Sequence, residues 1–427
     1  MRAFALEPEQ HDWCRELRTL AAERLRPLAE DGHGGKDGKD GQDGQDGQDG
    51  QDGRHGKDGH DGHGGNGVNR PLVAALGEHG LLARVFPPDG AAASALDLCL
   101  LRESLAYGCT EAETALALQG LGAYPIAQSG SEEQRDRWLP DVAAGRAVAA
   151  FALSEPGAGS DAAALALAAE PDGSAGASTS GSGGSAGGSG AGSGTGGWRL
   201  TGTKTWISNA PYADVYSVFA RTGEAPGPRG ITAFLVPADR PGLTGEPLDM
   251  LSPHPIGTLH FDGVPVTEAD VLGTPGEGFG VAMRTLNLFR PSVGAFAVGM
   301  AQAALDAALG HAAGRTAFGG VLRDLQTVSH QLAEMATRVE AARLLVYAAA
   351  AAYDRGDAGI AKRAAMAKLL ATETAQYVVD TAVQIHGAAA LQRGHLLEHL
   401  YREVRAPRIY EGATEVQRSI IAKELYR

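Results

Sequence analysis

The sequence has few cysteines, few aromatic residues and no excess of basic residues. Its three cysteines, Cys14, Cys99 and Cys109, lack the spacing of a metal site and are odd in number, which argues against a disulfide framework or a Cys-ligated zinc. Asp and Glu outnumber Lys and Arg by 51 to 37, and a net charge of −14 argues against nucleic acid as a partner. No apolar run approaches the roughly 18 residues of a membrane span, and the N-terminus opens no signal-peptide core. We therefore expect a cytoplasmic protein with no membrane or nucleic-acid partner.

Glycine, in contrast, is abundant, with 60 of 427 residues, and much of it lies in two segments. Between Gly35 and Gly65 it occupies every third position, but this stretch has no proline, so a collagen-like triple helix is not expected. We interpret 32–66 as a disordered, hydrophilic insert. Loose metal binding by the histidines in or beside it is the alternative (His33, His55, His60 and His63). The second segment, 173–197, is almost purely Gly, Ser, Ala and Thr and lies between two strand-like runs, which predicts an enlarged hairpin loop.

The remainder of the chain falls into three parts. Residues 1–150 are predicted to form an N-terminal α-helical domain, with a helix start at Ser131, where two glutamates follow. Short apolar runs between Gly, Pro and Asn predict a middle β domain over 151–270. Long helical patterns return over 271–427 and predict a C-terminal four-helix bundle. The expected fold class is α+β and multidomain, in the order α, β, α.

Two motifs of the middle region suit a planar or phosphorylated ligand. FALSEPGAGSDAAAL, from Phe151 to Leu165, has small residues that let a backbone approach a ligand, with Ser160 and Asp161 as polar contacts. An ordinary turn of small residues is the alternative. In WRLTGTKTWISNA, Trp206 can stack on a ring system and Ser208 can hydrogen-bond to it. A core tryptophan with a capping serine is the alternative there.

Two motifs of the C-terminal region carry charge. Arg290 precedes Pro291, and Arg315 opens the run RTAFG; arginine suits phosphate, although a solvated helix arginine is the alternative for both. In APRIYEGATEVQR, Glu411 lies just ahead of a predicted helix. A carboxylate there either compensates the helix dipole or, if an apolar cleft encloses it, acts as a tuned general base.

Taken in order, these motifs resemble the acyl-CoA dehydrogenase family. The resemblance covers nearly the whole chain outside the two glycine-rich segments. It includes YGCTEAETALALQGLGAYPI from Tyr107 to Ile126, GEGF from Gly276 to Phe279 and the closing IYEGATEVQRSIIAKEL.

The resemblance implies FAD as cofactor, held between the β domain and the C-terminal bundle, and a homotetramer. It places Phe151, Leu153, Ser154, Trp206 and Ser208 around the flavin of the same chain. It also implies cofactor contacts from Ser160 and Thr414, and contacts with the FAD of a neighbouring subunit from Arg315, Phe318, Gln384 and Gly387. Among the departures from the family pattern, Ala388 and Ala389 stand where glycines are common, which either crowds the adenosine portion or reflects an ordinary φ.

For the reaction, the resemblance implies that Glu411 takes the α-proton of an acyl-CoA thioester while the β-hydrogen leaves as hydride to flavin N5. The Glu411 N–H and a hydroxyl of the cofactor would polarise the thioester carbonyl. Ser160, Arg290 and Gly412 are the further substrate-binding residues, with Arg290 beside the CoA portion. The acyl pocket is expected near Thr114, Ala117, Leu118 and Phe289.

The resemblance leaves several activities open. Electrons are expected to pass to an electron-transfer flavoprotein, while an oxidase of the same fold uses O₂. The acyl group is carried either by CoA or by an acyl carrier protein. A stress-related flavoprotein without dehydrogenase activity, a nitroalkane-oxidase-like enzyme and a scaffold that lacks FAD are less favoured. The first conflicts with the acidic charge, and the second conflicts with a glutamate at position 411.

Deletion of Gly35 to Gly65 is expected to leave both Tm and activity nearly unchanged, because a solvated insert contributes little to the core. Thermal unfolding of the shortened and full-length chains tests this. A large loss of Tm would show that the insert is structural.

Overall fold

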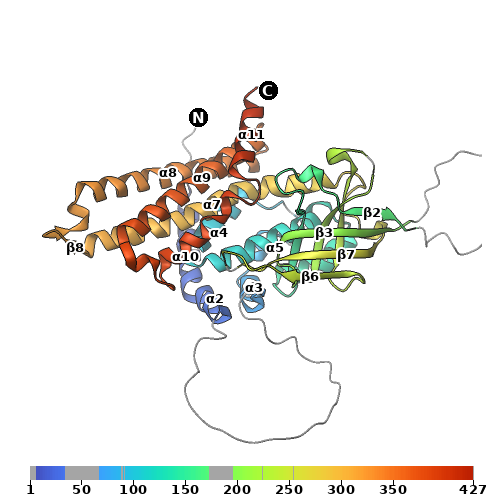
Figure 1. The fold of residues 1–427 in the computed structure, drawn as a ribbon, viewed down its shortest axis with the longest axis horizontal. Coiled ribbons are helices and arrows are strands. Elements are labelled where there is room, and N and C mark those ends of the chain that lie inside the picture. Colours follow the sequence, from blue (N-terminus) through green and yellow to red (C-terminus); the bar gives the residue numbers. More distant parts are fainter. Residues whose placement is uncertain are drawn as a thin grey trace, which may run out of the picture.

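The computed structural model describes residues 6–33, 67–87, 90, 92–172, 196–223, 225–252 and 254–426. The three predicted parts are present: helices, then a β-sheet, then helices (Figure 1). Almost all of the predicted insert 32–66, with three of its four histidines, and most of the segment 173–197 lie outside the described residues.

Helices form the first part of the chain, and their starts follow from capping. Asn69 accepts a hydrogen bond from the Leu72 N–H, and Ser131 forms a capping box with Gln134, as expected for the predicted start at Ser131. A π-helical turn, Ala21–Leu25, joins α1 and α2 into one continuous rod. The α-helices are α1 Pro8–Leu20, α2 Arg26–His33, α3 Arg70–Glu78, α4 Ala95–Gly108, α5 Thr110–Ser129 and α6 Glu132–Ala143.

The middle part is a seven-stranded sheet in which six strands follow the order β1-β4-β2-β3-β7-β6. The seventh strand, β5, pairs with β4 along its whole length. β2 and β3 pair antiparallel, with Pro171 opposite Trp198, so the glycine-rich segment between them connects a hairpin, as predicted. The strands are β1 Ala149–Ala152, β2 Ala168–Pro171, β3 Trp198–Ser208, β4 Val215–Arg221, β5 Ile231–Pro237, β6 Leu243–Pro247 and β7 Ile256–Val266.

The third part is helical, but its helices are unequal in length. Three long helices, α7 Gly278–Gly314, α8 Gln326–Asp354 and α9 Ile360–His386, pack against one another, and α4 of the first part packs along α7. The end of the chain is divided into α10 Leu396–Glu403 and α11 Thr414–Leu425. A short hairpin, β8 Thr316–Ala317 with β9 Gly320–Val321, connects α7 to α8.

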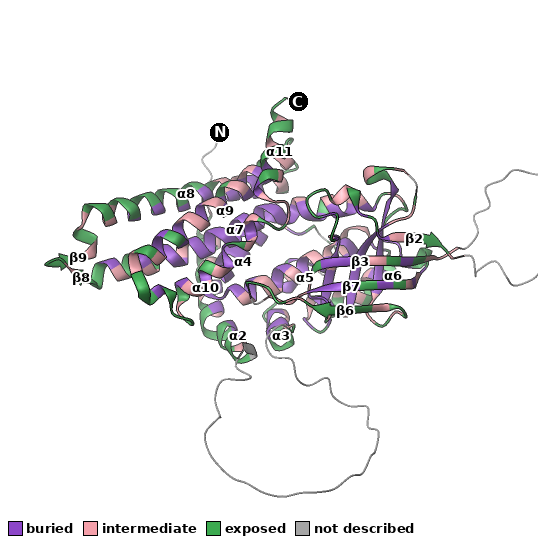
Figure 2. Ribbon diagram, in the orientation of Figure 1, coloured by how far each residue is buried: buried purple, intermediate pink, exposed green. Residues whose placement is uncertain are grey.

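Two hydrophobic cores stabilise the molecule. The larger core takes residues from α1 through α10, so the first and third parts of the chain share one interior; the smaller core lies within the sheet (Figure 2). By length and composition α7 alone among the described helices is apolar enough to cross a membrane, yet 72% of its most apolar window is buried inside the protein. Its apolar character therefore matches its place at the centre of the larger core.

Replacement of Gly122 by Ala is expected to lower the free energy of unfolding by about 1–3 kcal/mol. Gly122 of α5 lies directly on β1, and a Cβ there would come within 2.5 Å of the Ala149 carbonyl carbon and the Ala150 nitrogen. Gly310→Ala in α7 is the matched control, because a Cβ there meets open space. It is expected to add about 0.4–1 kcal/mol. Urea denaturation of both variants is the measurement, and equal effects would contradict the expected close packing.

Candidate functional site

Glu411 lies in the short segment that connects the turn Ala406–Arg408 to α11. Its φ is +51°, a left-handed conformation that non-glycine residues rarely adopt. Gly412 follows with φ +94°, and a Cβ there would come within 2.5 Å of the Gln417 amide nitrogen. This sharp turn ends in α11 and therefore sets the direction of the Glu411 side chain. Such strained backbone persists where neighbours hold it, and it is concentrated at functional sites.

Three buried side chains hold this segment by its carbonyl oxygens. Lys368 Nζ from α9 donates to the carbonyls of Tyr410 (3.0 Å) and Gly412 (2.7 Å). Gln417 Nε2 donates to the carbonyls of Glu411 (3.2 Å) and Gly412 (2.8 Å). Arg290 Nε from α7 reaches the Glu411 carbonyl at 3.4 Å. Two long helices and α11 thus fix the short segment around Glu411. Arg290 is buried, which excludes the alternative that it is a solvated helix arginine.

One oxygen of the Glu411 carboxyl group is enclosed, although the residue as a whole is partly exposed. Its Oε2 atom is buried and has no hydrogen-bond partner among the described residues. Burial raises the pKa of this carboxyl above the usual glutamate range, while the positive charges of Arg102, Lys368 and Arg290 oppose that shift. A buried acid with a raised pKa is suited to proton transfer near neutral pH. The geometry favours this interpretation over simple compensation of the α11 dipole.

Trp206 lies on β3 beside a break in the sheet register. The pairing of β3 with β7 shifts between Lys204 and Ile207, and such a bulge re-aims the side chains beside it. Trp206 has φ +56° and is 51% exposed, so it is not a core tryptophan. Ser208, two residues on, is partly exposed. An open indole face next to a hydroxyl is therefore available on this strand.

A buried lysine joins this strand to the other predicted ligand motif. Lys204 Nζ donates to the Leu153 carbonyl (3.0 Å) and to Glu155 Oε1 (2.7 Å). Glu155 also accepts the backbone N–H groups of Ala166 (2.6 Å) and Leu167 (2.9 Å), which closes the turn between them. Burial lowers the pKa of Lys204 to about 8, although Glu155 opposes the shift. These contacts place Phe151 and Ser154, which are partly exposed, beside β3, while the Leu153 side chain is buried.

Ser160 lies at the rim of a groove beside α11. The groove has a volume of about 390 Å³. Apart from Ser160 it is lined by Ala413, Glu415, Val416, Ser419, Ile420 and Lys423. The structure therefore brings Ser160 from the middle part next to the helix that follows Glu411 and Gly412. Thr414 at the start of α11 is buried, and its hydroxyl donates to Glu373 Oε1 at 2.8 Å.

Four further predicted residues lie elsewhere. Arg315 and Phe318 belong to the β8–β9 connection, which is at the opposite end of the molecule from β3 (Figure 1). Gln384 and Gly387 lie at the end of α9, where His386 stacks on His311 at 4.1 Å, so they are close to the end of α7 that carries Arg315. Phe318 is 94% exposed. Within one chain, the predicted cofactor residues thus form two separate groups. Ala388 and Ala389 are not among the described residues with positive φ, so an ordinary backbone accommodates them.

A buried polar cluster behind Glu411 was not predicted from the sequence. Arg102 of α4 forms an ion pair with Glu113 of α5 and donates to Ser292 Oγ of α7 at 2.7 Å. Burial raises the pKa of Glu113 to about 7, against the opposing charge of Arg102. The only sequence signal is a charge inside an otherwise apolar helix, in LCLLRESL.

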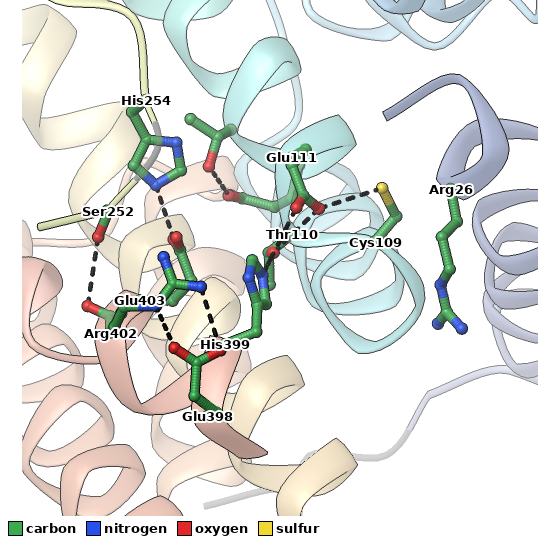
Figure 3. Close-up of polar contacts among 12 residues, drawn as sticks. Arg26, Cys109, Thr110, Glu111, Ser252, His254, Glu398, His399, Arg402 and Glu403 are labelled. Carbon is green, nitrogen blue, oxygen red and sulfur yellow. Dashed lines mark hydrogen bonds and ion pairs between the residues drawn. The ribbon is translucent and has the colours of Figure 1, made fainter. Parts of the chain in front are cut away.

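The same cluster extends to the loop between β6 and β7. His254 Nε2 lies 2.6 Å from Glu403 Oε2 of α10, and Ser252 Oγ donates to the Arg402 carbonyl at 3.2 Å (Figure 3). The neighbouring carboxylates, with Glu403 first, raise the pKa of His254 against the effect of burial. These contacts join the sheet to the bundle. The Ile256 that begins β7 pairs with Ser208, so the loop also positions the exposed end of β3.

Comparison with known proteins identifies the family of the chain. Three family models match in order: the acyl-CoA dehydrogenase N-terminal domain over 58–146, the middle domain over 150–264 and the C-terminal domain over 276–426. The chain belongs to the acyl-CoA dehydrogenase family. It is therefore an oxidoreductase of a family of flavoproteins, and the predicted fold class is confirmed.

Similar proteins span most of this acyl-CoA dehydrogenase chain. Human mitochondrial short-chain specific acyl-CoA dehydrogenase is 38% identical, with 83% of this chain and 82% of that protein covered. The structure of butyryl-CoA dehydrogenase from Megasphaera elsdenii has a TM-score of 0.80 at 29% identity, covering 99% and 100% of the two chains. A chain in the structure described as the electron transferring flavoprotein of Acidaminococcus fermentans has a TM-score of 0.81 at 30% identity, covering 99% of each chain.

Replacement of Lys368 by Met is expected to lower the free energy of unfolding by about 1–3 kcal/mol, because two buried carbonyl groups lose a donor. Lys362→Met, on the same helix at a partly exposed position, is the control and is expected to change stability by less than about 0.5 kcal/mol. Chemical denaturation measures both. Equal stabilities of the two variants would show that the Lys368 contacts contribute nothing.

Proposed function

We propose that this chain catalyses the FAD-dependent α,β-dehydrogenation of an acyl-CoA thioester with Glu411 as the base. The buried, unpartnered Oε2 of Glu411 on a strained and firmly held turn is the observation that carries this proposal. An acceptor oxygen that is buried without a donor is unfavourable on its own. It becomes useful when a substrate brings an acidic C–H to it, because the carboxylate then takes that proton.

The residues around β3 fit a flavin. Trp206 presents an open aromatic face, and Ser208 supplies a hydroxyl on the same strand. Lys204 and Glu155 fix the neighbouring segment that carries Phe151, Leu153 and Ser154. When bound, the flavin supplies the hydride acceptor that the carbon–hydrogen bond at Cβ requires. Every other step rests on the side chains and backbone of this protein.

The backbone at Glu411 suits a thioester carbonyl. The three carbonyl oxygens of the turn are engaged by Lys368, Gln417 and Arg290, whereas none of the described residues accepts the N–H of Glu411. A free N–H beside the base can donate to the carbonyl oxygen and stabilise the negative charge that develops there when the α-proton leaves. The base and the oxyanion donor therefore belong to one residue.

Substrate entry fits the groove beside α11. Ser160, Ala413 and Lys423 line it, and Ala413 directly follows the turn that carries Glu411 and Gly412. A groove of this size accommodates part of a CoA group, and Arg290 reaches the Glu411 carbonyl of the same turn. The acyl carbon that reacts would then lie between the groove and the buried carboxyl.

We propose further that the protein works as a homotetramer and passes electrons to an electron-transfer flavoprotein. The two groups of predicted cofactor residues lie at opposite ends of the folded molecule. The group far from β3 would therefore serve a cofactor bound mainly by a neighbouring subunit; it consists of Arg315, Phe318, Gln384 and Gly387. The exposed Phe318 fits that role. The similarity to a chain in an electron transferring flavoprotein structure supports the proposed acceptor.

Glu411→Gln is expected to retain the yellow cofactor but to reduce it roughly 10²–10⁴-fold more slowly with acyl-CoA, because the base is lost. Anaerobic stopped-flow bleaching of the flavin band is the measurement. The exposed Glu334→Gln on α8 is the control. An unchanged rate in Glu411→Gln overturns the assignment of the base.

The wild-type rate should also depend on pH. Because burial raises the pKa of Glu411, the carboxyl is protonated at a higher pH than an ordinary glutamate. Only the ionised form accepts a proton, so the rate falls as the pH is lowered through that raised pKa. The residual rate of Glu411→Gln is expected to lack this dependence.

A further inference from the structure

The polar cluster behind Glu411 is unusual for a pocket that receives an alkyl chain. Arg102, Glu113 and Glu403 are 2%, 1% and 1% exposed, and they come from three different helices, α4, α5 and α10. Buried charges are costly and are kept only when they are paired or have a role. The cluster lies close to the turn, because Arg102 donates to Ser292 of α7, two residues after Arg290, which reaches the Glu411 carbonyl.

Two carboxylate oxygens in this region lack a donor. One is Glu411 Oε2, whose role the proposed base assignment explains. The other is Glu403 Oε1, which is buried and has no partner among the described residues, although its second oxygen meets His254 (Figure 3). A buried acceptor without a donor requires an explanation, such as a donor on a bound ligand. A hydroxyl group on a bound substrate could donate to Glu403 Oε1.

The charges of the cluster decide between a hydroxyl and an acidic group. Away from the Glu411 turn, each carboxyl group of the cluster already faces one cationic partner: Glu113 pairs with Arg102, and Glu403 pairs with His254. A substrate carboxylate would add a negative charge without a partner next to these two carboxyl groups. A hydroxyl adds none, and it can both donate to a carboxylate and accept from a guanidinium.

We propose that Arg102, Glu113 and Glu403 form the inner wall of the acyl pocket and select thioesters whose acyl group carries a hydroxyl beyond Cβ. The inference rests on the proposed dehydrogenase function and names its substrate class. An unsubstituted alkyl chain of the same length leaves Glu403 Oε1 without a donor. Sites built to bind a polar group discriminate strongly against analogues that lack it.

The test compares ω-hydroxybutanoyl-, ω-hydroxypentanoyl- and ω-hydroxyhexanoyl-CoA, each with the alkyl acyl-CoA one carbon longer. The readout is the ratio of kcat/KM for each pair, because a ratio cancels any general change in the base. The wild-type enzyme is expected to favour the hydroxylated substrate by roughly tenfold or more in at least one pair. The double variant Arg102→Met/Glu113→Leu should lose that preference. Both partners are replaced together so that no buried charge is left unpaired.

Two further variants keep the test decisive. Glu403→Gln retains shape and should also lower the ratio, which covers the case in which the double variant does not fold. Arg343→Met/Glu103→Gln removes another buried ion pair that includes a residue of α4, and should leave the ratio unchanged. The inference is overturned if the wild-type enzyme prefers the alkyl chain in every pair, or if Glu403→Gln and the double variant keep the wild-type ratio. If no thioester of either kind reduces the flavin, the proposed function itself fails.

Discussion

The contact between the Lys368 ammonium and the carbonyls of Tyr410 and Gly412 determines how the segment that carries the proposed base is held. A fully buried lysine loses its hydration, and its pKa accordingly falls to about 8. The two carbonyl groups, at 3.0 and 2.7 Å, replace water as partners of the ammonium group. Because Lys368 lies on a long helix of the central core, it holds the turn to the most rigid part of the molecule. The left-handed φ of Glu411 is maintained by that support.

Buried charged pairs also join the parts of the chain that carry the site. Lys204 and Glu155 fix the two segments beside Trp206, and His254 with Glu403 connects the sheet to α10. Each pair bridges elements that hydrophobic packing alone would leave free to shift, because packing is not directional. Hydrogen bonds between charged groups are directional and strong. Two apolar cores thus stabilise the molecule, and directional contacts between charged groups position the residues of the candidate site.

The chain has three parts in the order α, β, α, but only two hydrophobic cores, because the two helical parts share the larger one. Residues of the first helices and of the last helices bury one another, with α4 along α7, while the sheet keeps its own interior. Glu411 comes from the helical part of the chain and Trp206 from the sheet. The proposed transfer of a proton and a hydride therefore depends on how firmly the two cores are held together.

The sequence by itself determined the order of elements, the hairpin of β2 and β3, and the motifs from which the candidate site residues were predicted. Those features depend on local patterns: hydrophobic periodicity, capping at Ser131 and motifs such as APRIYEGATEVQR. Tertiary structure alone decided that Trp206 is exposed, that Arg290 is buried and that the Thr414 hydroxyl meets Glu373. It also decided that Arg102 and Lys368 bring positive charge to the Glu411 carboxyl, and that Glu113 and Glu403 are buried beside cationic partners. These groups come from helices and loops far apart in the chain. Their charge is visible in the sequence, but burial and pairing depend on which elements meet, and local patterns carry no such information.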